Sequence, residues 1–457
     1  MRRITIAIAL LVAIGSAAQA QSGPLMHNGQ QAQRQTQSQT DSLPQGQTMT
    51  ICELFSRVEG SSTIAAQRTA VESAVLSLEA ARRQKLPDID ASLSLSYIGN
   101  ATMSERDFTG WQNLESPHLG NSFSLQAQQT VYAGGAISAG IKMAETGRRQ
   151  AETSLELTRS NVRFVALGQF LDLYKIDNRI RVYEKNIALT EQLIADISEK
   201  EQQGMALKND ITRYELQLES LKLGKSALQN SRAILNHQLC NTLGIDPSER
   251  IIPDPAIAAE VYAKEGEEHW QSVGSEKSPL LRMSQLEVEM SRHKETAERS
   301  AVLPKVAIVA ADNFNGPITY ELPPVDKNIN VWYVGVGVQY NLGNLYKSGK
   351  SIRRAASDTR AAQQRLQVQR ESLDNNIQAA WLDYLQSYVE LDTQLKSVEL
   401  ARENYEVINA RYLSQLALIT DMVDASNLLL SAELEEADAR IDIVYAYYKV
   451  KYAAGEI

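Results

Sequence analysis

Motifs of catalysis and metal binding are missing from this sequence of 457 residues. The two cysteines, Cys52 and Cys240, form no CxxC pair, and the five histidines show no ligand spacing. HExxH, GxSxG and phosphate-binding loops are absent, and Gly335-Val336-Gly337 lacks the third glycine of a dinucleotide fingerprint. We therefore expect no enzyme activity, cofactor or metal. An oxidising compartment would permit a disulfide between the cysteines, and two buried free thiols are the alternative that we favour.

A basic surface is missing as well, because 55 acidic residues outnumber 46 basic residues and leave a net charge of −9. Proteins that bind nucleic acids usually carry a basic stripe, so we expect no nucleic-acid partner. Beyond the N-terminus, no stretch approaches the 18 apolar residues of a membrane-spanning helix. If the mature chain enters a membrane, it must do so as β-strands.

The N-terminus has the parts of an export signal. Two arginines precede an apolar run over residues 4–14, and Ala18-Gln19-Ala20 is a small-x-small cleavage site. Residues 1–20 are therefore predicted to be a signal peptide, and Gln21 in place of a cysteine argues against a lipid anchor. Residues 21–48 are rich in glutamine, serine and threonine and are predicted to be a disordered linker.

Two segments alternate apolar and polar residues with the period of a strand. They follow a predicted helix over 51–86, which ends at Leu86-Pro87 because proline disfavours the α conformation before it. A soluble hairpin with one wet face and a pair of tilted membrane strands both fit this alternation, so the strands alone do not decide. The apolar positions are Ile89, Ala91, Leu93, Leu95 and Tyr97, then Phe123, Leu125, Ala127 and Val131.

Long helices are predicted after these strands. No proline occurs from 118 to 246, and residues 136–203 follow a helical pattern. Such a helix would be roughly 100 Å long at about 1.5 Å per residue. A break at Gly204-Met205-Ala206 predicts a reversal of the chain, followed by a second helix over 209–243.

The same order of elements occurs a second time. A predicted helix over 278–302 ends at Leu303-Pro304, strands are predicted at 305–312 and 331–340, and a long helix begins at 349. Apolar residues in this helix recur at near-heptad spacing, which predicts left-handed coiled packing. They are Leu366, Leu373, Ile377, Tyr384, Leu391, Leu395, Val398, Tyr405, Ile408 and Tyr412.

Three landmarks place the two copies in register. Leu86-Pro87 corresponds to Leu303-Pro304, Val131 to Gly135 corresponds to Leu345 to Gly349, and Asp210 corresponds to Asp421. Between the copies the offset drifts only from 217 to 214 to 211 residues, as a few loop deletions would produce. We therefore predict an internal duplication, with residues 49–250 as the first repeat and residues 251–457 as the second.

Membrane insertion of such a chain would require several copies. Four strands cannot close a barrel, and open sheet edges in lipid leave backbone groups unsatisfied. Three copies would supply about 12 strands, which is within the range of known barrels. Helices of roughly 100 Å cannot sit within a bilayer core of about 30 Å, so they must project into an aqueous space. The fold class that follows is an α+β membrane protein in which a β-barrel continues into a helical tube.

The chain resembles the TolC-like family of outer membrane efflux proteins over nearly all of residues 49–457. The duplicated order, the Leu-Pro pairs, Val131-Tyr132-Ala133-Gly134-Gly135 and Thr420 to Ala425 carry this resemblance. It implies a homotrimer with a 12-stranded β-barrel in the outer membrane lipid and an α-helical barrel in the periplasm. It further implies a periplasmic adaptor and an inner-membrane transporter of the RND type as partners, and small-molecule efflux as the function.

The resemblance also implies an acidic constriction at the tunnel entrance formed by Asp421 and Asp424. These aspartates are three residues apart, so they share a helix face, and a trimer would stack about six carboxylates. Such a ring would attract multivalent cations and filter the cargo by charge. A solvated acidic helix start, where carboxylates favour the macrodipole, is the alternative.

A gate contact between Asp210 and Tyr412 is implied in the same way, because the family pairs an aspartate of the first reversal with a tyrosine of the second. A helix-capping aspartate and a tyrosine packed in the seam fit these residues equally well. The family's arginine nearby is replaced by Ala417, and the counterpart of Gly204 is Gln415. Any latch here is therefore expected to be built differently.

Two further predictions concern the outer end and the competing functions. Phe108, Trp111, Trp332 and Tyr333 are candidates for an interfacial aromatic belt next to the loops 98–121 and 313–330, although Trp332 and Tyr333 point to opposite faces. A duct for protein secretion and a soluble periplasmic coiled-coil adaptor are the alternative functions. The adaptor would need one helical hairpin rather than a duplicated unit.

Overall fold

The computed structural model describes residues 47–205, 207–259, 262, 265–319, 321, 324–414 and 416–457. The predicted signal peptide 1–20, most of the predicted linker, Ala206 and Gln415 lie outside the described residues. The described residues form one compact unit, which contains both predicted repeats.

A small two-stranded sheet joins the beginnings of the two repeats. β1 (Gln47–Met49) pairs in parallel with β6 (Ile251–Pro253). The prediction that the linker extends to residue 48 is therefore wrong by two residues, because β6 supplies backbone partners that the local sequence does not reveal. The 3₁₀ helix η2 (Pro255–Ala259) and α5 (Glu267–Lys277) follow β6.

The helix predicted over 51–86 is interrupted. It consists of α1 (Ile51–Arg57), a 3₁₀ turn over Val58–Gly60 and α2 (Ser62–Arg83). The interruption lies where Gly60 meets the end of another helix, since a Cβ on Gly60 would lie 3.0 Å from the carbonyl oxygen of Leu243. A contact between residues far apart in the sequence therefore divides this helix.

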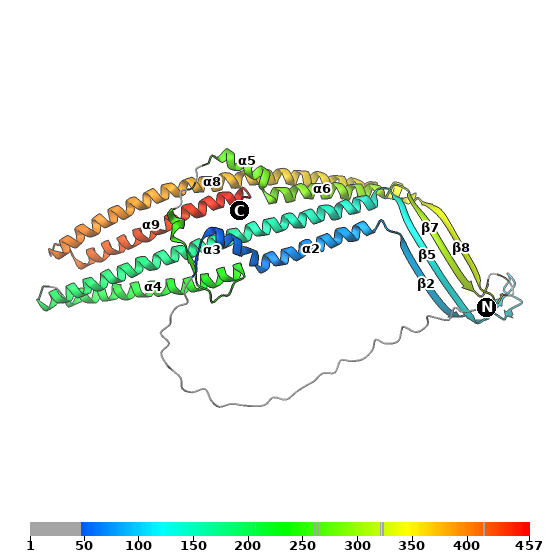
Figure 1. Cartoon of the computed structure of the whole chain (residues 1–457), viewed down its shortest axis with the longest axis horizontal. Helices are drawn as coiled ribbons and strands as arrows, with labels where there is room; N and C mark the ends of the chain where they lie inside the picture. The colour runs from blue at the N-terminus through cyan, green and yellow to red at the C-terminus, as the bar shows by residue number, and fades with distance from the viewer. Residues whose placement is uncertain are drawn as a thin grey trace, which may run out of the picture. The chain divides into compact units, whose positions relative to one another are not determined.

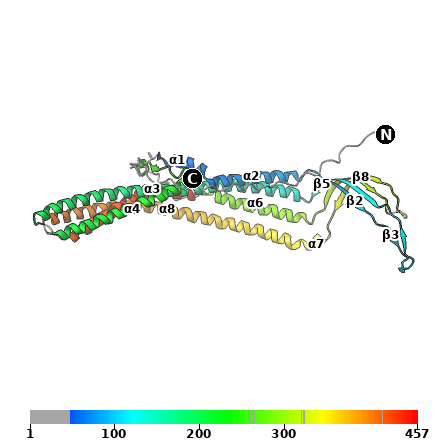
Figure 2. The same cartoon turned by 90° about the horizontal axis from the view of Figure 1, so that it is seen from below.

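Four strands form one antiparallel sheet at one end of the long helices, as Figures 1 and 2 show. They are β2 (Asp88–Tyr97), β5 (Leu119–Ala133), β7 (Lys305–Gly316) and β8 (Ile329–Gln339), in the order β2-β5-β7-β8. All four predicted strands are present, and the central pair β5–β7 joins the two repeats. Within the described residues the outer edges of β2 and β8 have no partner strand.

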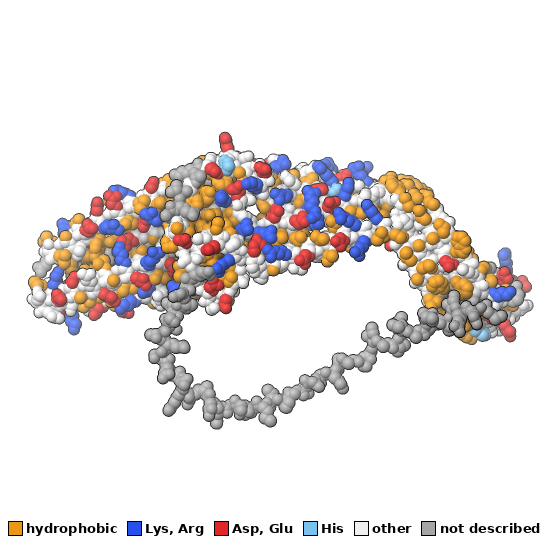
Figure 3. Space-filling model, viewed as in Figure 1, with side chains coloured by type: hydrophobic (Ala, Val, Ile, Leu, Met, Phe, Trp, Pro, Cys, Tyr) orange, Lys and Arg blue, Asp and Glu red, His pale blue; other side chains and the backbone are white. Residues whose placement is uncertain are grey.

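The register separates the sheet into an apolar face and a polar face. Leu93 pairs with Phe123, Phe123 with Phe314, and Ala310 with Val334, so the apolar residues of all four strands share one face. Serine, asparagine and glutamine residues dominate the opposite face of β2 and β5. Figure 3 shows hydrophobic side chains covering the strands, whereas charged side chains spread over the helices.

Two details of this sheet differ from the sequence prediction. A bulge between Thr130 and Tyr132 shifts the register, so Tyr132 opposite Val306, and not the predicted Val131, continues the apolar face. Trp332 pairs with Asp312 and lies on the apolar face, whereas Tyr333 pairs with Ala311 on the other. The register therefore makes Trp332 the only one of the two that can belong to an aromatic belt on the apolar face.

The predicted outer loop 98–121 contains a hairpin of its own. β3 (Ala101–Met103) pairs with β4 (Gln112–Leu114), and the chain turns between them. Phe108 and Trp111 lie in this turn and are exposed, and the indole nitrogen of Trp111 donates to the carbonyl oxygen of Phe108 at 2.9 Å. They are thus separated along the chain from the strands that carry the apolar face.

Two long helical hairpins extend away from the sheet (Figure 1). The first consists of α3 (Ala136–Gln202) and α4 (Lys208–Leu243), and the second of α8 (Gly349–Leu413) and α9 (Ile419–Ala453). The bounds of α3 and α4 agree with the predicted helices to within one residue, and α8 begins where a long helix was predicted to begin. Before α8, the short helix α7 (Gly343–Lys347) takes the place of the strand end found in the first repeat.

The shorter helices continue the returning arms of the hairpins towards the sheet. α2 packs beside α3 where α4 has ended, and α6 (Pro279–Ser300) packs between α3 and α8 where α9 has ended. Ser61 and Ser278, the buried N-caps of α2 and α6, lie against Gly244 and Gly455 at the ends of α4 and α9. Each repeat thus stacks two helices end to end.

The largest core cluster lies at this stacking level and draws on both repeats. It includes Phe170 and Leu171 of α3, Trp270 of α5 and Ile377 of α8. Tyr384 donates to or accepts from Tyr388 at 2.9 Å. Many of the tyrosines gather here rather than on the sheet: Tyr174, Tyr262, Tyr384, Tyr388, Tyr447 and Tyr448.

A series of ion pairs joins the two hairpins along α3 and α9. Lys175 pairs with Asp442 at 2.5 Å, Arg179 donates to Asp438 at 3.0 Å, and Lys185 pairs with Glu433 at 2.9 Å.

Cys240 is buried, Cys52 is exposed, and both are free thiols. The expectation of two buried thiols is therefore correct for Cys240 and wrong for Cys52, which lies on the outer side of α1.

A matched pair of glycine substitutions tests the end-to-end stacking. Gly204 and Gly244 both have positive φ angles, 75° and 70°, but a Cβ on Gly204 meets nothing within 4 Å. On Gly244 it would lie 2.3 Å from the carbonyl oxygen of Gly60. We expect Gly204→Ala to cost about 1–2 kcal/mol and Gly244→Ala about 3 kcal/mol or more, measured by guanidinium unfolding. Equal losses would contradict the close contact.

Candidate functional site

The two chain reversals lie at the end of the hairpins away from the sheet and share one backbone geometry (Figure 1). The backbone nitrogen of Met205 donates to the carbonyl oxygen of Lys200 at 2.8 Å, and that of Leu416 donates to Arg411 at 2.8 Å. These corresponding bonds are 211 residues apart, which is the offset between Asp210 and Asp421. The duplication therefore extends to the hydrogen bonds of the reversals.

Asp210 and Asp421 each stabilise the start of the helix that follows a reversal. The carboxylate of Asp210 accepts from the backbone nitrogen of Leu207 at 3.4 Å, and that of Asp421 accepts from Leu418 at 3.0 Å. Both carboxylates lie in a first helical turn, where the macrodipole favours negative charge. The helix-capping role considered for these residues is thus present, and any further role must come from their surroundings.

Asp421 and Asp424 are both exposed on one side of α9. Met422 and Ala425, which lie beside them in sequence, are buried on the other side. Within the described part of the chain, Asp424 has no recorded hydrogen bond or ion pair. The two carboxylates therefore lie on the exposed side of α9.

Asp210 and Tyr412 line the same cavity of about 300 Å³ between the two reversals. Lys200, Asp210, Tyr412 and Ala417 line it. Burial raises the pKa of the Tyr412 phenol, and the negative charge of Asp210 raises it further. Within the described residues no hydrogen bond joins Asp210 to Tyr412, although both line this cavity.

Lys200 is a member of this cavity that the sequence analysis did not select. It lies in the last turn of α3, where a basic side chain favours the helix terminus. The cavity thus contains a cation from the first reversal, although Ala417 stands where the resembling family has an arginine. The available signal was the position of Lys200 two residues before the end of α3 at Gln202.

Tyr214 is the second residue that the sequence analysis did not select as functional. It follows Asp210 by four residues on α4, so both share one helix face. Tyr214 is 2 % exposed and forms a buried cluster with Ile197, Ile419 and Met422. Tyr405 and Tyr412 are partly buried against this cluster. The packing between the reversals therefore includes three tyrosines, of which the sequence analysis assigned a functional role only to Tyr412.

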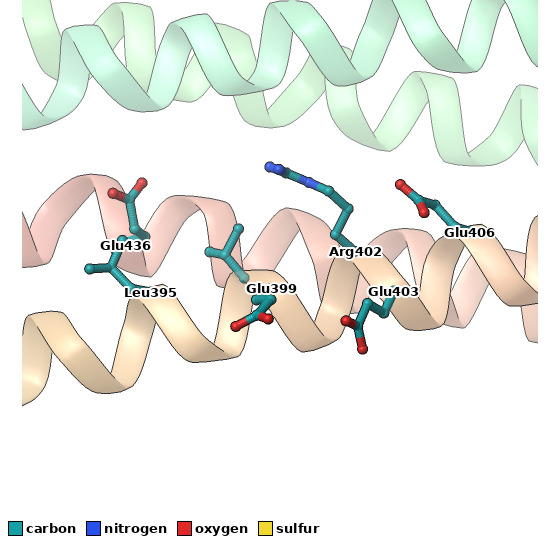
Figure 4. A pocket seen from close by; sticks show the side chains of 7 residues that line it. Leu395, Glu399, Arg402, Glu403, Glu406 and Glu436 are labelled. Atoms are coloured by element: carbon teal, nitrogen blue, oxygen red, sulfur yellow. The ribbon is translucent and has the colours of Figure 1, made fainter.

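An acidic groove of about 410 Å³ lies farther along α8 and α9. Glu399, Glu403, Glu406 and Glu436 line it together with Arg402, which pairs with Glu433 at 3.5 Å. Figure 4 shows Arg402 pointing to one side of α8, and Glu399 and Glu403 to the other. These carboxylates spread along the side of the hairpin, so they are separate from the aspartates at the reversal.

The described residues contain neither a candidate metal site nor a candidate membrane-spanning helix. No group of three or more histidine, cysteine, aspartate or glutamate side chains is placed to hold a metal ion there. No helix in the described ranges combines the length and the apolarity needed to cross a membrane.

Comparisons with known proteins agree with this architecture. The profile of the family named "Outer membrane efflux protein" matches residues 274–456, which is most of the second repeat. The outer membrane efflux protein BepC of Brucella suis is 21 % identical over 340 residues, covering 73 % of this chain and 72 % of BepC. Over residues 274–456 the chain therefore matches the outer membrane efflux protein family.

Solved structures support the same fold across nearly the whole chain. The outer membrane protein VceC of Vibrio cholerae superimposes with a TM-score of 0.71 at 13 % identity, covering 89 % of this chain and 96 % of VceC. The outer membrane channel CmeC of Campylobacter jejuni gives a TM-score of 0.70 at 14 % identity, covering 88 % and 86 %. The predicted resemblance to this family and the α+β fold class are therefore confirmed, and the predicted outer membrane location agrees with these matches.

Proposed function

We propose that three copies of this chain form a passive exit duct for small molecules across the outer membrane. The observation that carries this proposal is the pair of unpaired sheet edges, β2 and β8, which lie at opposite ends of the strand order. Exposed edges in lipid would leave backbone groups without partners. Pairing β8 of one copy with β2 of the next satisfies them, and three copies give a closed barrel of about 12 strands.

The two outer helices of the helical part also expose apolar side chains. α4 packs on α3, α3 on α9 and α9 on α8, so α4 and α8 are the outer helices of the two hairpins. Both carry apolar side chains that are more than half exposed: Leu216, Leu223 and Ile234 on α4, and Leu382, Val389, Leu400 and Val407 on α8. Contact between α8 of one copy and α4 of the next would bury both stripes and close the helical tube.

The roles of the predicted site residues follow from this assembly. Asp421 and Asp424 of three copies would form stacked carboxylate rings at the periplasmic entrance and attract multivalent cations. Asp210 and Tyr412 would form the gate contact beside them, with Lys200 as an additional charge. The duct itself consumes no energy, so an inner-membrane transporter of the RND type would drive the cargo through a periplasmic adaptor. The aromatic belt would include Trp332 on the apolar face.

Fractionation of the cell envelope tests the assembly. We expect a trimer in the outer membrane that resists sodium dodecyl sulfate, because its barrel has no free edge. A monomer released by osmotic shock would contradict the proposal and favour a soluble periplasmic role.

A duct for protein secretion is the second candidate. Deleting the gene should sensitise cells to a panel of toxic compounds if efflux is the function, and should abolish export of a protein if secretion is.

The gate contact predicts an effect of one hydroxyl group. We expect Tyr412→Phe to raise the spontaneous conductance in planar bilayers roughly threefold, because the hydroxyl that faces the same cavity as Asp210 is lost from the proposed gate. Ala417→Ser, which changes the same cavity without removing the phenol, serves as the control and should stay within about twofold of wild type. Unchanged conductance of the Tyr412→Phe channel would remove this residue from the gate.

A further inference from the structure

Tyr214 occupies an unusual position in the packing between the two reversals. Its side chain is 2 % exposed, and its hydroxyl oxygen is buried without a hydrogen-bond partner among the described residues. The burial is complete within one chain, by Ile197 of α3 and by Ile419 and Met422 of α9. A neighbouring copy therefore cannot reach the hydroxyl to satisfy it.

A buried hydroxyl without a partner disfavours the arrangement that buries it. Mutational data place this effect at about 5-fold to 100-fold in an equilibrium constant. Burial raises the pKa of Tyr214, and the nearby Tyr412, Tyr405 and Asp210 raise it further. The phenol therefore stays neutral, because burial disfavours its charged form. The carboxylate of Asp210 is oriented towards the backbone of Leu207 instead.

The elements that bury Tyr214 belong to different hairpins. Tyr214 is on α4 of the first hairpin, whereas Ile419 and Met422 are on α9 of the second. Parting of the two reversals would therefore expose the hydroxyl to water and give it hydrogen bonds. Closing them removes that water without supplying a replacement.

Building on the proposed entrance gate, we propose that Tyr214 weakens the packed arrangement of the reversals and sets how readily they part. Its hydroxyl would act in the direction opposite to that proposed for Tyr412, which is assigned to the closed entrance. A channel that must respond to a modest binding energy from a partner needs its two states within a few-fold to a few hundred-fold of each other. An unsatisfied hydroxyl in the closed packing keeps them within that range.

Two measurements on the full trimer test this. Hydrogen exchange of the backbone amides at the start of α4 and α9 reports how often the reversals part, whether or not they gate a channel. Conductance in planar bilayers reports the gate. We expect Tyr214→Phe to slow exchange there about tenfold and to lower the spontaneous conductance several-fold. Tyr405→Phe is the matched control, since its hydroxyl is not among the buried unpaired atoms, and it should change neither measurement more than about twofold.

The outcomes separate this inference from the proposed function. Slower exchange together with lower conductance would support both. Slower exchange with unchanged conductance would support the role of Tyr214 in the packing and contradict the gate at this end. Unchanged or faster exchange in the Tyr214→Phe protein would overturn the inference, whatever the conductance shows.

Discussion

Changing both Asp421 and Asp424 to asparagine is expected to weaken block of the channel by a trivalent cation such as La³⁺ about 100-fold. Both side chains are exposed on one side of α9, and in a trimer they would place about six carboxylates around the entrance. A single close charge pair is worth about 1 kcal/mol in water and more where solvent is restricted, so removing several charges exceeds a tenfold effect. Planar-bilayer titration of the cation measures the change.

Asparagine is the suitable replacement because it retains an acceptor for the backbone nitrogen of Leu418, which Asp421 now binds at 3.0 Å. The loss can then be attributed to charge rather than to the helix start. Asp196 and Glu199 provide the control, since they are also exposed and three residues apart near the first reversal. The double change Asp196→Asn with Glu199→Gln should leave the block within about twofold. Block that is unchanged in the Asp421 and Asp424 variant would exclude these residues from the constriction.

Replacing Arg232 with methionine is expected to destabilise the chain by about 3–5 kcal/mol, the usual effect of removing one partner of a buried ion pair. Arg232 is 9 % exposed. Its guanidinium donates to the two carboxylate oxygens of Asp177 at 2.5 and 3.1 Å and to the carbonyl oxygen of Ile251 at 2.9 Å. It therefore ties α4 to α3 and to β6, and its loss leaves two acceptors without a donor.

A more exposed arginine that pairs with an aspartate provides the comparison for Arg232. Arg179 pairs with Asp438 between α3 and α9, but its side chain is 44 % exposed, so Arg179→Met should cost only about 0.5–1 kcal/mol. Guanidinium unfolding followed by circular dichroism measures both losses. Adding Asp177→Leu to Arg232→Met should recover part of the stability, because the uncompensated buried charge is removed. Similar losses for the two arginine variants would show that the burial of Arg232 is unimportant.

Much of the fold could be predicted because its signals are local. The period of two in β2 and β5, the Leu-Pro pairs before the first strands and the proline-free run through α3 and α4 all depend on near neighbours in the sequence. Their backbone preferences therefore persist in the structure. The errors arose where distant segments meet, as at Gly60 beside Leu243 and at the pairing of β1 with β6.

The candidate site was predictable only in part, for the same reason. Asp210, Tyr412, Asp421 and Asp424 were selected from a resemblance and from their repeat positions, and the structure places the first two at one cavity. Lys200 and Tyr214 were missed because a helix-end lysine and an apolar-face tyrosine look ordinary in sequence. Their importance depends on what faces them from the other hairpin.

The sequence by itself determined the duplication, the strand pairs, the lengths of the helices and the resemblance of the chain to a known family. These follow from periodicity and from turn residues, which act over a few positions. Only the tertiary structure decided which strand edges lack partner strands and which arginine is buried beside a carboxylate. It also decided which tyrosine hydroxyl is buried without a hydrogen-bond partner. Burial and pairing depend on segments up to about two hundred residues apart, and the free energy of a polar group is set by those partners rather than by its own sequence.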